Sequence, residues 1–181
     1  NMSQMFYGCS RLTSLDLSNF NTSKISDMNS MFYECRNLTN LDLSSFNTSN
    51  VVHMESMFYE CSGLTSIDLS NFDTSKVKFM SQMFYGCNGL KNLELINFVT
   101  SSVTTMDGLF QGCSGLTAIY VGAGWSTSAV TSSSNMFSGC TKLKNYNSSY
   151  LDKTRANYGS SGYLSTKFAY GQISDSSSLF N

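Results

Sequence analysis

The chain has 181 residues, a formal net charge of −1 at pH 7 and only 13% charged residues, about half of the share that is usual in soluble domains. Its 41% of hydrophobic residues suffices for a packed core, which excludes wholesale disorder. The near-zero charge argues against a nucleic-acid partner. No stretch approaches the ~20 apolar residues that span a bilayer, so we expect no membrane insertion by this segment.

A short unit is repeated along the chain. Its six cysteines recur at intervals of 26, 26, 26, 26 and 27 residues, and columns of Leu, Phe and Met keep the same period. The cysteines are Cys9, Cys35, Cys61, Cys87, Cys113 and Cys140. A single 26-residue unit has too few apolar groups to enclose a core, whereas stacked copies would share a continuous one. The period therefore predicts a solenoid of about six coils.

Each unit offers two candidate elements. The first is an L-x-x-L-x-L segment, as at residues 12–17, whose alternation predicts a short strand. Strands of successive units would form a parallel sheet with a spacing of about 4.8 Å. After a turn at Asn21-Thr22-Ser23, the return segment (residues 25–35 and their equivalents) spaces its apolar residues by about 3.5. That spacing predicts a helical turn or short helix, although Val51–Met54 fits a short second strand equally well.

The regular pattern ends after Cys140. We expect the repeat array to cover residues 1–146 and a C-terminal cap to cover residues 147–170. Residues 171–181 are expected to be a Ser-rich tail or linker. Because the sequence starts inside a unit, with neither an initiator Met nor a signal peptide, we interpret it as a fragment of a longer protein.

The repeat motif resembles a known family. Residues 31–49 read M-F-Y-E-C-x-x-L-T-x-L-D-L-S-x-F-N-T-S, and the pattern returns with small changes from Met57. This is similar to the 26-residue bacterial surface-protein repeat, a branch of the BspA-type leucine-rich repeats, over residues 2–146. The resemblance implies an α/β repeat solenoid: a right-handed coil with a parallel sheet on its concave face and short helical turns or short strands opposite. It also implies a secreted or anchored, extracellular protein of the bacterial cell surface that acts in adhesion or recognition.

An acidic column is the first candidate binding site. It consists of Asp16, Asp42, Asp68 and Glu94. These residues share one outward position on consecutive predicted strands, where like charges repel unless they are solvated or matched by cations. The column could dock a basic partner or hold Ca²⁺ weakly. The alternative, which we favour, is a solvated face whose carboxylates accept hydrogen bonds from neighbouring Ser and Thr.

A tyrosine ladder is the second candidate site. It consists of Tyr7, Tyr33, Tyr59 and Tyr85. Exposed tyrosines are rigid, amphipathic anchors for a protein or a sugar, but packing of the rings within the stack, with hydroxyls reaching solvent, is the favoured interpretation. A threonine column raises the further alternative of an ordered-water or ice-binding surface. Its members are Thr22, Thr48, Thr74, Thr100 and Thr127.

Catalysis and metal binding find no support in the sequence. The cysteines are too far apart in sequence for a zinc site, and stacking favours buried free thiols over disulfides. His53 is the one histidine, which removes most nucleophile–base arrangements. We therefore predict no enzyme, no cofactor and no metal.

The leading hypothesis is a non-enzymatic cell-surface module. It would bind a protein or glycan of a host or neighbouring cell through its repeat face. The alternative is a structural spacer of a larger surface protein. The sequence leaves the oligomeric state open.

Overall fold

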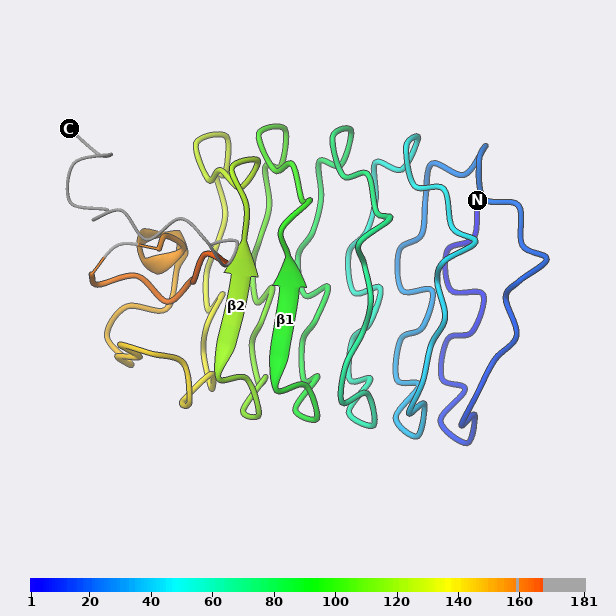
Figure 1. Ribbon diagram of the computed structural model, residues 1–181, viewed down its shortest axis with the longest axis horizontal. Coiled ribbons are helices and arrows are strands. Elements are labelled where there is room, and N and C mark those ends of the chain that lie inside the picture. The colour runs from blue at the N-terminus through cyan, green and yellow to red at the C-terminus, as the bar shows by residue number, and fades with distance from the viewer. Residues whose placement is uncertain (159, 168–181) are drawn as a thin grey trace.

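The computed structural model describes residues 1–158 and 160–167 as a stack of repeated coils that lie side by side along the long axis of the molecule (Figure 1). Backbone hydrogen bonds join each coil to the next, mostly at separations of 25 or 26 residues. The Met28 amide donates to the His53 carbonyl at 3.0 Å, and the Phe32 amide donates to the Met57 carbonyl at 2.9 Å. The prediction that 26-residue units stack is therefore confirmed. The predicted tail, 171–181, lies outside the described residues.

The regular sheet is smaller than the sequence predicts. Within the described residues its strands are β1 (Asn92–Leu95) and β2 (Ala118–Val121), which pair in parallel with Asn92 opposite Ala118. In the units before β1, an aspartate stands at the position of Glu94, and its carboxylate accepts a hydrogen bond from the amide two residues further on. Such local bonds compete with strand pairing. The expectation of a strand in every unit is thus wrong for these units, for this reason.

The return segments are not helical, so the helical prediction for residues 25–35 is wrong. Across the described residues, the one helix is the 3-10 turn η1 (Lys153–Arg155), which lies after the array. Ser30 and Glu34 have positive φ angles of 54° and 56°, and the equivalent positions of later coils do too. This backbone aims alternate amides at the next coil rather than back along its own segment, as a helix would. Single-residue parallel bridges join successive coils, beginning with Asp27 to His53, which fits the short-strand alternative.

The core consists of identical side chains stacked upon one another. Phe32 and Phe58 lie parallel with ring centroids 5.8 Å apart, and the column continues through Phe84. The Met, Leu and Cys columns are buried beside it. Each buried thiol also donates a hydrogen bond to a phenylalanine carbonyl of the preceding coil, as Cys61 does to Phe32 at 3.1 Å. All six cysteines are free.

Residues 147–158 and 160–167 cover the C-terminal end of the stack. Tyr163 is almost fully buried and meets the Phe137 ring edge-on, with 5.1 Å between centroids. Its hydroxyl donates to the Asn147 and Tyr150 carbonyls. Ser165 then pairs with Tyr120 of β2 as a parallel bridge. The last coil is therefore closed by an aromatic residue and by a further extended segment.

Candidate functional site

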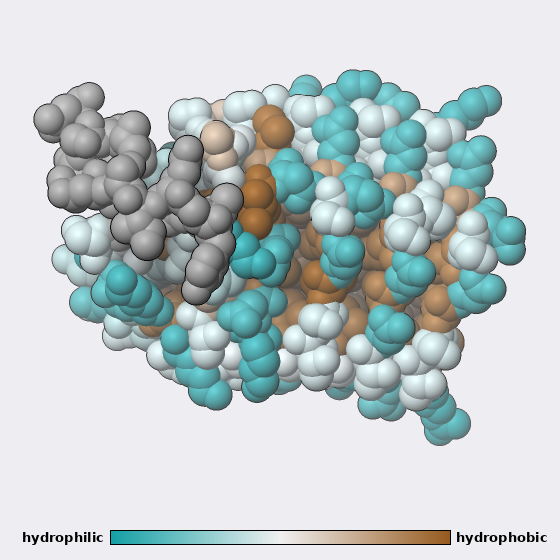
Figure 2. All heavy atoms as spheres, in the orientation of Figure 1, coloured by the Kyte–Doolittle hydropathy of each residue, from teal (hydrophilic) through white to brown (hydrophobic). Residues whose placement is uncertain are grey.

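A hollowed surface lies on the side of the stack that carries β1 and β2. We call this side the strand face. Two adjoining hollows of about 750 and 370 Å³ share residues of the segment 66–70 and together form the strand-face groove. Figure 2 shows this side, with apolar surface along its middle and hydrophilic side chains around it. Asp42, Asp68 and Glu94 line the groove, together with the apolar Ile67 and Ile96.

The acidic column is therefore partly gathered into one groove. Asp42 and Asp68 project from its floor, while Asp16 belongs to the neighbouring coil and lies outside the lining of both hollows. Hydrogen bonds from the Ser44 side chain and amide hold the pKa of Asp42 below its ordinary value. The like charge of Asp16 acts in the other direction and is outweighed. The Ser70 amide likewise lowers the pKa of Asp68. These residues remain charged at neutral pH, and each uses one carboxylate oxygen to shape its own turn.

Glu94 differs from the aspartates because it has a cationic partner. The Lys167 ammonium forms an ion pair with the Glu94 carboxylate and lies over the Tyr120 ring, 5.5 Å from its centroid. Sequence reasoning missed Lys167, since 73 residues separate the two partners and no periodic signal connects them. It also missed Ile96, which is 42% exposed in a column that is otherwise serine in the earlier units.

The tyrosine ladder is continuous. Successive rings from Tyr7 to Tyr85 are parallel within 6°, with centroids 4.3–4.5 Å apart. The rings therefore cover one another, as the packing interpretation expects, while Tyr7 at the end remains 51% exposed. Burial raises the pKa of Tyr33 and Tyr59. None of the ladder residues lines the strand-face groove, so the structure does not unite the two candidate sites.

The first four threonines of the column, Thr22 to Thr100, do not face water, while Thr127 is partly exposed. The burial of these four removes the basis of the ice-binding alternative. Thr48, Thr74 and Thr100 are at most 1% exposed. The Thr74 hydroxyl donates to the Val99 carbonyl at 3.0 Å and accepts from the Val99 amide at 2.8 Å. The buried hydroxyls therefore form hydrogen bonds between neighbouring coils and are not available to order water.

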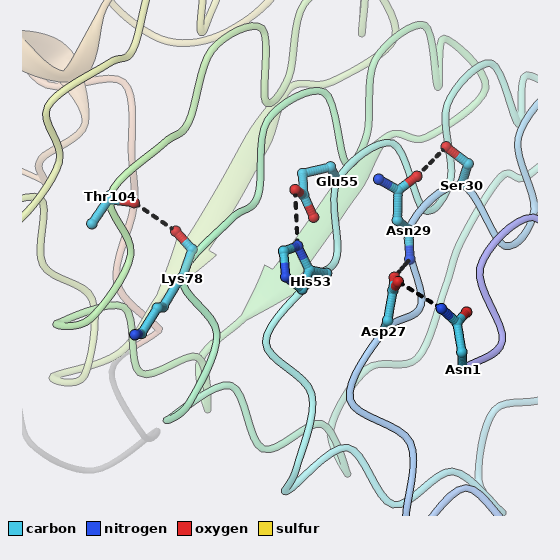
Figure 3. A network of polar contacts seen from close by, with 8 residues as sticks. All are labelled: Asn1, Asp27, Asn29, Ser30, His53, Glu55, Lys78 and Thr104. Carbon is cyan, nitrogen blue, oxygen red and sulfur yellow. Dashed lines mark hydrogen bonds and ion pairs between the residues drawn. The ribbon is translucent and has the colours of Figure 1, made fainter.

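The histidine belongs to a column of polar contacts on another side of the coils (Figure 3). His53 Nδ1 lies 3.2 Å from Glu55 Oε1, and its ring stacks on Phe79 with centroids 4.8 Å apart. Asp27, one coil before, accepts from the Asn1 amide group instead. In the part of the chain that the structure describes, no cluster of three or more His, Cys, Asp or Glu side chains is arranged to hold a metal ion. Nor does any described helix have the length and apolarity to cross a bilayer.

Stacked coils with an open groove define a repeat protein. The family model described as "Mycoplasma protein of unknown function, DUF285" matches residues 1–122 and again 68–168, and the chain belongs to this family. No curated protein matches it. A solved leucine-rich-repeat protein of T. pallidum (TpLRR) is similar at 20% identity, over 91% of this chain and 78% of that one, with a TM-score of 0.46. The family's description assigns no activity, so a function has to be argued from the groove.

Proposed function

We propose that this chain is a non-enzymatic recognition module of a bacterial cell surface, which binds a protein partner through the strand-face groove. It would be a right-handed, leucine-rich-repeat-like solenoid of the BspA type, acting in adhesion. The observation that carries the proposal is the groove of about 750 Å³ in which carboxylates lie beside the exposed Ile96 and the partly buried Ile67. Polar groups that surround apolar contact surface are the usual composition of a protein-binding site.

The shape of the groove favours binding over chemistry. It is open along the face, and Asp42 and Asp68 keep lowered pKa values, whereas a general acid needs a raised one. The columns repeat the same groups from coil to coil, which suits many weak contacts made in register. A rigid framework is also present, because each coil is hydrogen-bonded to the next.

The test is a binding screen of the purified chain against immobilised extracellular-matrix proteins and glycans. The matched variant is the double substitution Asp42→Asn and Asp68→Asn, which removes two charges while keeping an oxygen for the bonds to Ser44 and Ser70. A partner that binds the chain and is lost with the double variant supports the proposal. A partner that binds both proteins equally would place recognition elsewhere, and absence of any partner would favour the spacer alternative.

A further inference from the structure

Among the described residues, no cation forms an ion pair with the aspartates of the groove. The ion pairs of the described residues connect Arg36 with Glu34 and Glu60, His53 with Glu55, and Lys167 with Glu94. Asp42 and Asp68 therefore project into the groove as charged groups whose contacts are the hydrogen bonds of their own turns. Lys91 is the cation that also lines the larger hollow, and it makes no ion pair with either aspartate.

The last carboxylate of the acidic column, Glu94, is already paired with a lysine of the same chain, Lys167. The segment that carries Lys167 approaches by strand pairing: the Val121 amide donates to the Ser165 carbonyl at 2.9 Å, and the Ser165 amide donates to the Ile119 carbonyl at 2.8 Å. Two residues later the Lys167 ammonium reaches Glu94, one coil away from β2. An extended segment with a lysine is thus already seated at one end of the strand face.

We propose that the groove takes an extended segment of a partner protein that presents lysine side chains to Asp42 and Asp68, as Lys167 does to Glu94. This inference rests on the proposed function and specifies its partner. Ile67 and Ile96 line the same groove, and a lysine can lay its aliphatic stem on such a surface while its ammonium meets a carboxylate. The same negative charge disfavours anionic partners, such as nucleic acids and sulfated or sialylated glycans.

The inference also gives Lys167 a role. By neutralising Glu94 it removes one carboxylate from the row that a partner could use. The C-terminal segment therefore limits the groove at the β2 end. Releasing Glu94 would lengthen the row of available charges by one position.

The experiment measures fluorescence anisotropy of three labelled 12-residue peptides, which alternate valine with lysine, glutamine or glutamate, at low and high salt. We expect the lysine peptide alone to bind, and to weaken as salt rises. Asp42→Asn and Asp68→Asn should each weaken it about two- to fivefold, as expected for exposed ion pairs. Lys167→Gln should strengthen it by a similar factor. Thermal unfolding of each variant checks that the fold is retained.

Asp73→Asn is the matched control. Asp73 is exposed and accepts from the Ser75 amide at 2.9 Å in the same kind of turn, but it does not line the groove. Equal binding of the lysine and glutamine peptides, or an equal loss of affinity in Asp73→Asn, would overturn the inference. So would displacement of the lysine peptide by millimolar Ca²⁺ but not by Mg²⁺ at the same ionic strength, which would indicate a calcium site. A screen partner lost with the double variant, together with no peptide binding, would refute the inference and leave the proposed function standing.

Discussion

At the scale of single residues, the repeat uses polar atoms inside its core to join coils. The threonine hydroxyl bonds to both backbone groups of one residue in the next coil, and the cysteine thiol satisfies a phenylalanine carbonyl of the preceding coil. Both side chains are small enough to be buried in a column of identical neighbours. A buried backbone group that loses its partner costs about 1–3 kcal/mol, so these residues fix the alignment of the coils as well as filling space.

Replacing Thr74 by valine tests this role. The substitution keeps the volume of the side chain but leaves the Val99 amide and carbonyl without the Thr74 hydroxyl. Because the Val99 backbone is only partly buried, we expect the free energy of unfolding to fall by about 1–3 kcal/mol, measured by urea denaturation. Thr65→Val, at an exposed position, is the control and should change it by less than about 0.5 kcal/mol. Equal effects of the two substitutions would contradict the assignment.

The buried thiols predict a loss of stability at alkaline pH. Burial raises the pKa of Cys35 to about 11 and that of Cys140 to about 12, and it holds those of Cys61, Cys87 and Cys113 well above the ordinary 9.0. Below pH 9 these thiols are protonated in both states, so their contribution is fully present. Above pH 9 the unfolded chain releases protons that the folded chain retains, and stability falls.

With five such thiols, the free energy of unfolding should fall by about 5 kcal/mol between pH 9 and pH 10. Urea denaturation at pH 8, 9 and 10 in the presence of reductant measures this slope. Cys87→Ala should reduce the slope by about a fifth, even though it also lowers stability at pH 8. A slope that is unchanged in this variant would show that other groups cause the alkaline loss.

At the scale of elements, one methylene group decides whether a segment forms a regular strand. Asp42 and Asp68 are short enough to accept from the amides of Ser44 and Ser70. Glu94 makes no such bond and lies in β1. The same aspartates therefore shape the turn and supply the charge of the groove. Because the same side chains do both, the acidic column and the irregular backbone occur together.

Exchanging Asp42 and Asp68 for glutamate should extend the sheet. The longer side chain gives up the local bond, and we expect residues 40–43 and 66–69 to pair as β1 and β2 do. Nuclear magnetic resonance would detect this as new contacts between α-protons of neighbouring coils. Unaltered contacts, with Ser44 and Ser70 amides still protected from exchange, would show that the aspartates do not limit the strands.

The sequence predicted the parts of the fold that depend on the period alone. Columns such as Phe32, Phe58 and Phe84 had to stack once the units stacked. The helix prediction failed because the spacing of about 3.5 arises here from residues with positive φ, such as Ser30 and Glu34. Glycines at the equivalent positions, Gly108 and Gly112, were the signal that could have revealed this. The contact of Lys167 with Glu94 could not be predicted, since it depends on how the chain returns after the last coil.

At the scale of the whole molecule, stability is carried by contacts between nearest neighbours. Coils in the middle of the stack have a neighbour on each side, and Phe58 and Phe84 are almost fully buried there. The last complete coil instead depends on the cap, through Tyr163 against Phe137. The described end of the array is thus the part whose protection comes from a few non-repeated residues.

Tyr163→Ala should therefore loosen the stack from its C-terminal end. We expect a loss of about 3–5 kcal/mol, the usual cost of removing a large buried aromatic side chain, together with faster amide exchange in residues 136–146 than in residues 57–87. Tyr163→Phe keeps the ring against Phe137 but removes the hydroxyl bonds to Asn147 and Tyr150, so it should cost less. Uniform exchange along the array in Tyr163→Ala would contradict end-to-end unravelling.

The nearly constant separation of 25 or 26 residues between bonded backbone groups of neighbouring coils has a consequence for how such a protein can change over generations. A duplication or deletion of one whole unit in the gene leaves every remaining coil with the neighbour geometry that it already had. It also adds or removes one carboxylate position along the strand face. Unequal recombination between copies could thus lengthen or shorten the binding surface in single steps, and the strength of attachment could vary among descendants while the fold stays the same.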